Sequence, residues 1–416
     1  MTDKYTIIKN VKYIDVAARK SVTCDVFLGE RSHEGRRLVT TGKTHGNDRF
    51  VPANSEEEIF LAMYDGLTIQ NARGKHFSPA FVDISCRLGI GPPAGEDFFN
   101  STASARLGGW GVIAPAPEKS TPADTSPYCR MIPVASLRKA VENSLAGVSI
   151  VSDLCDPYLP NNDLRNIMKY CAGENILFIA GRMDDGIVGD GKVNLGRASK
   201  MLRTPGIAPS AENVAVSRAI VLAAETECRL HIPVVSTAAS VDIIRAAKSA
   251  GIAVTCGTTP THFALCDDDV VLHGASAVVY PPLRGKDDRA AIIAGLADGT
   301  IDCISSGHSP ASGKDKEGRI NDVAFGAIGF ETAFSLCVTY LLRPKHIDIY
   351  RLIQLLSHSP AEILGVDTTL KQGEFVRANL ISLDSETIYT HSNLRTRCAN
   401  TPFYGRPLWG TVDEVY

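Results

Sequence analysis

The sequence has no long apolar run, no paired cysteine motif and no large excess of one charge. No apolar stretch reaches the roughly 18–20 residues of a membrane-spanning helix, and we expect no secretion signal. The 11 cysteines include no C-x-x-C pair, which argues against a structural zinc site or a disulfide frame and favours reduced, buried thiols. Lysine and arginine total 43 against 46 acidic residues, a net charge of −3, so a surface that coats nucleic acid is not expected. These absences predict a cytoplasmic protein that binds neither membrane nor nucleic acid.

A regular alternation of strands and helices occupies most of the chain. With 416 residues, 44% of them hydrophobic and 21% charged, the composition is that of a folded protein larger than one average domain. From Pro79 onward, apolar strand-like runs alternate with helical stretches. The strands expected there are Ala80–Cys86, Gly111–Ala114, Tyr128–Val134, Gly147–Asp153, Ile176–Ala180, Cys228–Val235, Ile252–Cys256 and Ile301–Ser306.

This repeated alternation predicts parallel strands closed into a barrel. Short β-like runs precede it, from Thr6 to Gln70, and others follow it, from Val376 to Val415. We therefore expect an α/β fold: a (β/α)8 TIM-type barrel over residues 79–366, with a small composite β-sandwich domain over 1–78 and 367–416. The expected helices are Leu137–Ser144, Asn161–Cys171, Asn213–Thr226, Val241–Ala250, Asp287–Ala297 and Asp348–Ser357, the last ending before Pro360.

Several stretches match one known family in order along nearly the whole chain. None is a chemical motif alone, but together they resemble the dihydroorotases of the amidohydrolase superfamily, specifically the type that associates with aspartate transcarbamoylase. The matching stretches are Gly206–Arg218, Val235–Thr237, Pro281–Arg284, Gly295–Asp302, Phe325–Thr332, Asn400–Phe403 and Gly405.

The resemblance implies a zinc site at the C-terminal ends of the strands, and this chain departs from it. The family carries His-x-His after strand one, a carboxylated Lys or an Asp after strand four, a His after each of strands five and six, and an Asp that acts as general acid/base after strand eight. Zinc takes about four N, S or O donors, and here only Asp153 remains a good ligand. We therefore expect no bound metal, no cofactor and no catalytic residue. The relict metal-site positions are Ser85, Arg87, Asp153, Gly181, Val234 and Gly307.

The positions that hold substrate in the family have changed as well. Gly89 replaces an arginine, and Ala116 lies where the family has a polar Met-Pro-Asn-Thr segment. Tyr280 replaces an asparagine before Pro-Pro-Leu-Arg, and Ala311 replaces a histidine. A site that binds a carboxylate and a pyrimidine amide has thus lost its cation and its polar amides. We expect the Pro-Pro-Leu-Arg stretch to support the fold.

Some polar residues near the strand ends have alternative interpretations. His231, His262 and His308 could form a relocated metal site, but we favour hydrogen-bonded structural histidines. Cys86 could be a nucleophile, but strand alternation points it between strand and helix as a small apolar residue.

Arg87 could bind a small anion or face solvent, but we favour an internal ion pair with Asp153. If both members are buried, Asp153→Ala should cost roughly 3–5 kcal/mol. For two loops we favour a structural interpretation over a functional one. Ile90–Gly95 is a turn rather than a phosphate loop, and the charged run Gly313–Arg319 is a solvated, mobile loop.

The function expected from the resemblance is that of a non-catalytic dihydroorotase homologue. It would serve pyrimidine biosynthesis as a structural subunit that holds aspartate transcarbamoylase in a homo- or hetero-oligomer. One alternative is a diverged amidohydrolase that acts on a cyclic amide with a relocated or absent metal. The other is a sensor that binds a small ligand in the relict pocket.

Overall fold

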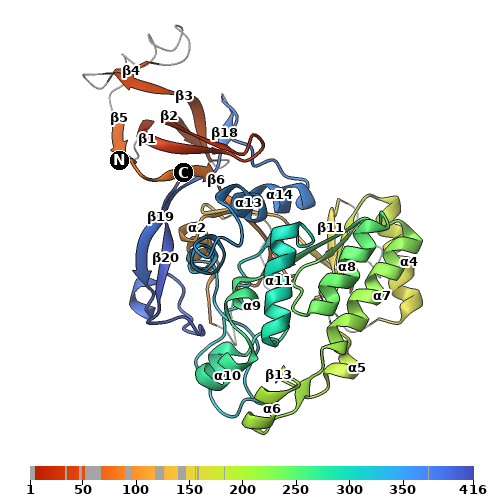
Figure 1. The fold of residues 1–416 in the computed structure, drawn as a ribbon. Helices are drawn as coiled ribbons and strands as arrows, with labels where there is room; N and C mark the ends of the chain where they lie inside the picture. Colours follow the sequence, from red (N-terminus) through yellow and green to blue (C-terminus); the bar gives the residue numbers. More distant parts are fainter. Residues whose placement is uncertain are drawn as a thin grey trace.

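The structure, a computed structural model, describes residues 5–32, 35–45, 49–51, 67–89, 95–117, 126–138, 147–154, 156, 159–181, 183–372 and 374–416 (Figure 1). Two features expected from the sequence fall largely outside these residues. They are the helix Leu137–Ser144 and the turn Ile90–Gly95.

The central part of the chain forms the expected (β/α)8 barrel. A six-stranded sheet has the order β10-β11-β12-β15-β16-β17 and a three-stranded sheet the order β7-β8-β9, and every pairing within them is parallel. The strands are β7 (Phe81–Cys86), β8 (Trp110–Pro115), β9 (Arg130–Met131), β10 (Ala135–Ser136), β11 (Ile150–Ser152), β12 (Leu177–Ile179), β15 (Leu230–Ile232), β16 (Val254–Thr258) and β17 (Cys303–Ile304).

The first and last strands meet through two hydrogen bonds at their C-terminal ends. The backbone N–H of Arg87 donates to the carbonyl oxygen of His308 at 2.7 Å. The carboxylate of Asp83, on β7, accepts from the backbone N–H of Ser306 at 3.2 Å. The barrel therefore closes where the sequence places the relict site.

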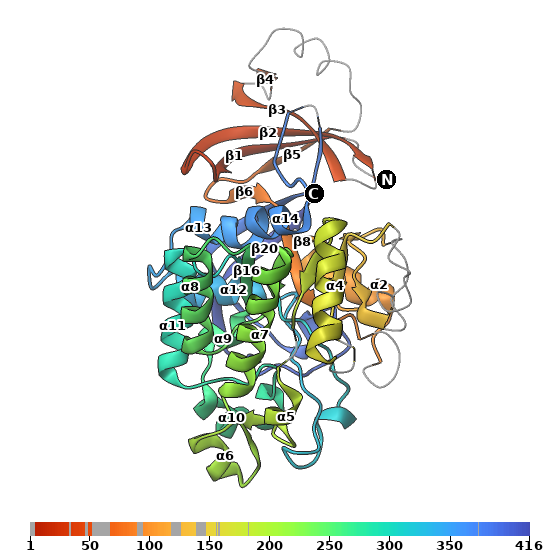
Figure 2. The same cartoon turned by 90° about the vertical axis from the view of Figure 1, so that its right-hand side faces the viewer.

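Helices cover the outside of the barrel, and α4, α7, α8 and α11 run side by side across one flank (Figure 2). Of these, α4 has the apolar stripe that its sequence predicts, because Leu164, Ile167, Met168 and Cys171 are buried against the barrel. The α-helices are α2 (Phe98–Leu107), α4 (Asn161–Gly173), α5 (Asp185–Val188), α6 (Arg197–Leu202), α7 (Ser210–Thr226), α8 (Ala238–Ser249), α9 (Pro260–Ala264), α10 (Asp267–His273), α11 (Lys286–Asp298) and α12 (Ala333–Cys337).

The last helical segment runs past Pro360, so the expectation that it ends before this proline is wrong. It starts as α13 (Ile349–Ile353), continues as one π-helical turn, η4 (Gln354–His358), and ends as α14 (Ser359–Leu364). A proline lacks the N–H that an uninterrupted α-helix would use. Because the π turn restarts the bonding pattern, Pro360 falls in the first turn of α14, where that N–H is not needed.

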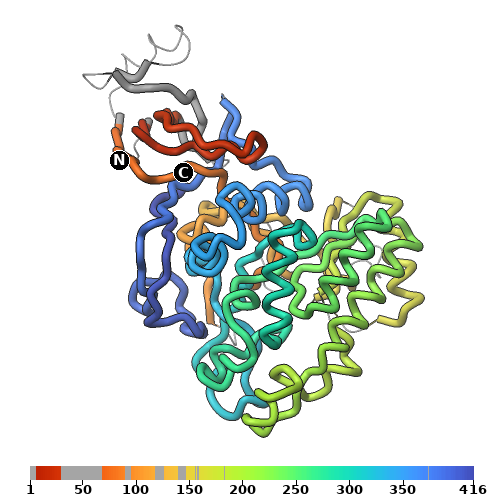
Figure 3. The backbone as a smooth tube through the Cα atoms, in the orientation of Figure 1, coloured from red at the N-terminus to blue at the C-terminus, as the bar shows by residue number. Residues whose placement is uncertain are grey.

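One further sheet takes its strands from both ends of the chain. Its path is β18-β3-β2-β1-β6-β19-β20, with β4 on β3 and β5 on β1, so N-terminal and C-terminal segments lie side by side (Figure 3). The domain boundaries at 78/79 and 366/367 stay a prediction. The strands are β1 (Tyr5–Asp15), β2 (Lys20–Ser32), β3 (Gly35–His45), β4 (Arg49–Val51), β5 (Leu67–Asn71), β6 (His76–Pro79), β18 (Phe375–Val376), β19 (Ala378–Ile388) and β20 (Pro407–Val415).

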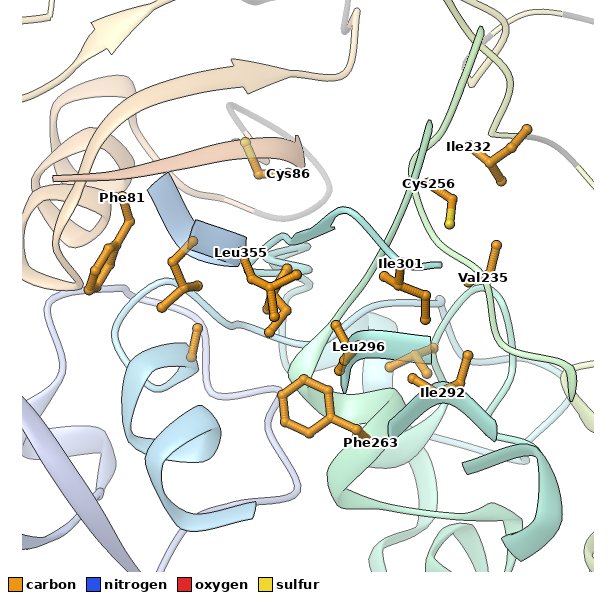
Figure 4. Packing of buried hydrophobic residues seen from close by; sticks show 14 of the residues in the cluster. Phe81, Cys86, Ile232, Val235, Cys256, Phe263, Ile292, Leu296, Ile301 and Leu355 are labelled. Carbon is orange, nitrogen blue, oxygen red and sulfur yellow. The ribbon is translucent and has the colours of Figure 1, made fainter. Parts of the chain in front are cut away.

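The main apolar cluster fills the space between the barrel strands and their helices. Ile292 and Leu296 of α11 pack near Ile301 and Phe263 in this layer (Figure 4). All cysteines that the structure describes are free thiols, and all but Cys24 are buried, as the sequence predicts. Across the described residues, no helix is long and apolar enough to cross a membrane.

Candidate functional site

A cavity of about 440 Å³ opens at the C-terminal ends of the barrel strands. Most of the relict positions meet there, although they come from strand ends far apart in the sequence. Asp153 is not part of the cavity lining, but the next residue, Leu154, is. Gly89 and Ala311 are not part of the lining either. The relict positions that line the cavity are Ser85, Arg87, Gly181, Val234, Gly307, Ala116 and Tyr280, and Cys86, His262 and His308 line it as well.

Below Ser85 lies a buried carboxylate, that of Asp83. Its oxygens accept from the backbone N–H of Ser85 at 2.9 Å and of Ser306 at 3.2 Å. Burial raises the pKa of Asp83 to about 6, and hydrogen bonds from Ser306, Ser85 and Ser305 oppose that rise. The donors around this carboxylate are therefore hydroxyl and backbone groups.

The position of the strand-five histidine is closed by a neighbouring side chain. The backbone N–H of Gly181 donates to Oδ1 of Asp153 at 2.7 Å. A Cβ atom built on Gly181 would overlap the side chain of Leu154. Any residue larger than glycine at 181 therefore requires Leu154 to move.

Gly307, at the position of the strand-eight acid, is held in the left-handed conformation that favours glycine. Its φ is +65°, and a Cβ atom there would lie 2.9 Å from the side chain of Thr259. Val234 lines the cavity as an apolar wall. Gly181, Val234 and Gly307 thus offer no ligand side chain, and a Cβ atom at 181 or 307 would meet the side chain of Leu154 or Thr259.

The residues at this site do not fit zinc. Gly181, Val234 and Gly307 offer no donor atom, and Arg87 brings a permanent charge to the cavity. Within the described part of the chain, no three His, Cys, Asp or Glu side chains converge as a metal site would need. The absence of bound metal from the protein stays a prediction.

The three histidines near the strand ends are buried and hydrogen-bonded. Both ring nitrogens of His262 have partners, Oγ1 of Thr259 at 2.7 Å and the carbonyl oxygen of Pro281 at 3.0 Å. Nδ1 of His231 lies 2.9 Å from Oγ1 of Thr255. Nδ1 of His308 accepts from the backbone N–H of Gly329 at 3.2 Å, and its ring stacks on Phe330.

Burial lowers the pKa of all three histidines, and it lowers the pKa of His231 and His308 to about 3. Their rings are therefore neutral. Among the residues that the structure describes, Nε2 of His231 and Nε2 of His308 have no hydrogen-bond partner, so only His262 is fully satisfied, and the choice of structural histidines over a relocated metal site stays a prediction. Cys86 is buried in the main apolar cluster and also reaches the cavity wall.

The side chain of Arg87 is exposed and that of Asp153 is half-buried. The cost of 3–5 kcal/mol expected for a fully buried pair therefore does not apply to Asp153→Ala. The contact between the two side chains stays a prediction.

The cavity wall also carries an aromatic pair. The rings of Tyr280 and Phe325 meet edge to face with centroids 5.4 Å apart, and Nζ of Lys192 lies 4.3 Å from the Phe325 ring centroid. The hydroxyl of Tyr280 accepts from the backbone N–H of Met183 at 2.9 Å. A tyrosine at this position thus supports the cavity wall.

The charged run Gly313–Arg319 is largely exposed, as the sequence suggests, but Lys316 within it is anchored to neighbouring loops. Nζ of Lys316 donates to the carbonyl oxygens of Ala275, Val278 and Ala324 at 3.0, 3.2 and 2.7 Å. Burial lowers the pKa of Lys316 to about 8. This lysine anchors the loop that carries Phe325 into the cavity wall.

Asn400 fixes the same loop at both of its ends. The Nδ2 atom of Asn400 donates to the carbonyl oxygens of Ser309 and Gly326, at 3.0 and 3.1 Å. Its Oδ1 atom accepts a hydrogen bond from the backbone N–H of Ala311 at 3.1 Å. Asn400 begins one of the family-like stretches, so that stretch acts as a brace for the cavity rim.

Two other family-like stretches meet in a buried ion pair behind the cavity. Glu212 and Arg284 are both 3% exposed, and NH2 of Arg284 lies 3.8 Å from Oε2 of Glu212. Glu212 also accepts from the backbone N–H groups of Ser236 and Thr237, at 2.8 and 3.1 Å. Arg284 also donates to the carbonyl oxygen of Ile207 at 2.9 Å. The Pro-Pro-Leu-Arg stretch therefore supports the fold, as expected.

Sequence reasoning missed the residues that close or brace the cavity, because their contacts are tertiary. Leu154 is an ordinary apolar residue in the sequence, and only its position against Gly181 gives it a role. Lys316 lies in a run of charges that is typical of a solvated loop. The one available signal was Glu212, an acidic residue inside a family-like stretch.

Comparisons with known proteins place the chain in one family. No family model matches the chain. The dihydroorotase of Thermoanaerobacter sp. strain X514 is 33% identical over 376 residues, covering 85% of this chain and 87% of that protein. The dihydroorotase of Lactiplantibacillus plantarum is 32% identical over 433 residues, covering 98% and 96%.

Solved structures agree on the fold. The L-hydantoinase (dihydropyrimidinase) from Arthrobacter aurescens superposes with a TM-score of 0.80 at 20% identity, covering 99% of this chain and 94% of that one. Dihydropyrimidinase from Brevibacillus agri gives 0.79 at 18% identity, covering 99% and 93%. The barrel thus has the amidohydrolase fold, and on its sequence likeness to the curated relatives the chain belongs to the dihydroorotase family.

Proposed function

We propose that this chain is a non-catalytic member of the dihydroorotase family that acts as a structural subunit for aspartate transcarbamoylase in pyrimidine biosynthesis. The observation that carries the proposal is the state of the cavity. Gly181, Val234 and Gly307 offer no side-chain donor for zinc, Arg87 carries a positive charge, and Leu154 uses the space beside Gly181. The identity of the partner is supported by the sequence resemblance alone.

Selective retention supports a role for the scaffold rather than for the pocket. The ion pair between Glu212 and Arg284 is intact although it touches no relict ligand position. Asn400 and Lys316 likewise hold the loop at the cavity rim. A chain that keeps its internal bracing while its chemistry is absent is better suited to assembly than to turnover.

The test is to mix the purified chain with the transcarbamoylase of the same organism. A stable complex buries at least about 1,000 Å² in total, so it should co-elute on size exclusion at micromolar concentration and change transcarbamoylase activity or stability. Val234→Phe, which fills the cavity, is the matched control, and association should survive it. Separate elution with unchanged transcarbamoylase activity refutes the proposal.

The open cavity of about 440 Å³ supports a second candidate, a sensor of a small ligand. Thermal shift with pyrimidine intermediates distinguishes the two candidates. A ligand-induced rise in melting temperature that Val234→Phe abolishes, without any complex on size exclusion, favours the sensor.

The remaining alternative is a diverged amidohydrolase. It requires turnover of a cyclic amide by the purified protein, with or without added metal. Measurable cyclisation of carbamoyl aspartate above a mock preparation would establish it. We expect none, because the position of the general acid/base is Gly307.

A further inference from the structure

Two buried cysteines, Cys171 and Cys228, lie at the end of the barrel opposite the cavity. Cys171 is in the last turn of α4, and Cys228 follows the end of α7. Each shortly precedes a barrel strand, β12 or β15, so both lie at the N-terminal ends of the strands. The cavity opens at the C-terminal ends of the strands, so these thiols are separate from the relict site.

The two helices that lead to these cysteines take the same course. α4 turns into β12 through Asn175, and α7 turns into β15 through Glu227, with φ values of +54° and +58°. The helices pack against each other (Figure 2). An ion pair between Arg165 of α4 and Glu225 of α7, at 2.5 Å, joins them near the end of α7. Two neighbouring helix–strand units are therefore held side by side.

The strand register brings the two cysteines together. In the parallel pair β12 and β15, Phe178 lies opposite Leu230. Two residues earlier on both segments, Cys228 is level with Ile176. The backbone N–H of Ile176 donates to the carbonyl oxygen of Cys171 at 2.8 Å. Both cysteines therefore adjoin the same residue, at the start of the same strand pair.

The two thiol groups are in direct contact. The S–H group of Cys171 donates to Sγ of Cys228. The S–H group of Cys228 in turn donates to the carbonyl oxygen of Arg229 at 3.6 Å. Both cysteines are fully buried, and both belong to the main apolar cluster. The fold thus holds two reduced sulfur atoms against each other in its core.

The shared hydrogen bond makes the two thiols chemically unequal. It lowers the pKa of Cys228, with help from the positive charge of Arg229, and it raises the pKa of Cys171. The thiolate is the reactive form of a cysteine. Cys228 is therefore the sulfur that reacts first, and Cys171 is the sulfur that resolves the product.

A second pair of neighbouring cysteines is arranged differently. Cys256 and Cys303 lie on the adjacent strands β16 and β17. Sγ of Cys256 donates to the carbonyl oxygen of Thr300 at 3.3 Å, and Sγ of Cys303 lies on the side of Gly257. Successive residues of a strand point to opposite faces, so the side chains of Cys256 and Cys303 point away from each other. This pair serves as an internal control.

We propose that Cys171 and Cys228 form a redox-sensitive staple, which a hydroperoxide converts into a disulfide that stabilises the barrel. The thiolate of Cys228 attacks one oxygen of hydrogen peroxide, the O–O bond breaks, and the leaving hydroxide takes up a proton as water. The sulfur of Cys171 then attacks the sulfenic acid at Cys228. The S–S bond forms, the S–O bond breaks, and the hydroxyl leaves as water with the proton of Cys171. Two thiols are oxidised, and one peroxide is reduced to two waters.

The staple would join residues that are 57 positions apart in the sequence. A bridge across a loop of this length removes many conformations of the unfolded chain. The loop contains Gly181 and the family-like stretch Gly206–Arg218, so part of the cavity wall lies within it. This role is independent of the transcarbamoylase proposal, because it requires only the chain and a peroxide.

The test treats the full-length protein with excess hydrogen peroxide and alkylates the remaining thiols in denaturant. Tryptic peptides are then mapped by mass spectrometry without reductant. The peptides Tyr170–Arg182 and Ala219–Arg229 should be linked, and dithiothreitol should release them. Oxidation should raise the melting temperature by at least about 3 °C, and reduction should reverse the rise. No peptide should link Cys256 to Cys303.

Two variants identify the roles of the sulfur atoms. Cys171→Ser removes the resolving thiol, so dimedone should label a persistent sulfenic acid at Cys228 in this variant and not in the wild type. Cys24→Ser, which changes a half-buried thiol in the composite sheet, is the matched control and should leave the link intact.

The peptide map of the wild type requires no variant, so the proposal stays open to refutation even if Cys171→Ser fails to fold. Unlinked peptides after oxidation overturn the proposal. A link that leaves the melting temperature unchanged, or an equal yield of a link between Cys256 and Cys303, overturns it as well.

Discussion

Two buried carboxylates show how differently two parts of this barrel are maintained. Glu212, behind the cavity, lies 3.8 Å from the guanidinium of Arg284 and accepts from several neighbours. Asp83, beneath the relict metal positions, is fully buried among hydroxyl and backbone donors. The first is a completed ion pair and the second is a carboxylate whose pKa is raised to about 6. The difference is one of partners: the carboxylate behind the cavity faces a guanidinium, whereas the one beneath the relict positions is met by hydroxyl and backbone donors.

The largest expected effect comes from breaking the completed pair. Glu212→Ala leaves the guanidinium of Arg284 buried without its partner, so the free energy of unfolding should fall by roughly 3–5 kcal/mol. Urea titration measures it. Glu225→Ala is the matched control, because it removes the same residue type from an exposed site on the same helix, and stability should be nearly unchanged. Equal losses in both variants would contradict the contrast.

The next largest loss of stability is expected where a side chain is placed at relict position 181, because Leu154 uses that space. Gly181→His should cost roughly 1–3 kcal/mol, because its Cβ atom overlaps Leu154. Gly173→His at the open end of α4 is the control, since nothing lies within 4 Å of a Cβ atom there. The double variant Gly181→His with Leu154→Ala should recover part of the loss. Strict additivity of the two single changes would mean that Leu154 is not the obstacle.

The free energy of unfolding should also depend on pH because of Asp83, by an amount similar to or smaller than the loss expected for Gly181→His. Its folded pKa of about 6 lies above the value of about 3.9 in an unfolded chain. Between pH 4 and pH 6 the folded state therefore holds more protons than the unfolded state, and stability falls as the pH rises, by on the order of 2 kcal/mol. Asp83→Asn should flatten this slope in urea titrations across the window, whereas Asp163→Asn on the exposed start of α4 should preserve it. A slope that Asp83→Asn leaves intact would assign it to other groups.

The smallest expected effect is that of a chelator. Because the cavity residues do not fit zinc, dialysis against EDTA should shift the melting temperature by less than about 1 °C. Elemental analysis before dialysis should find no stoichiometric transition metal. A stoichiometric metal whose removal lowers the melting temperature would show that the site has moved rather than disappeared.

The sequence predicts the barrel well because alternating strands and helices leave a strong periodic signal. It also predicts which positions converge at the cavity, since Ser85, Gly181 and Gly307 all line it. It fails where contacts join distant segments. The anchoring of Lys316 on Ala275 and Val278 depends on the packing of two loops, and no local pattern reports it. The π turn before Pro360 is another such case, because its register is set by packing.

The contact between Gly181 and Leu154 also has a consequence for the order of substitutions. A histidine placed at 181 alone would meet a steric penalty before any metal could be bound. On the proposal that the chain is non-catalytic, building a metal site here would therefore require a smaller side chain at 154 before the histidine at 181.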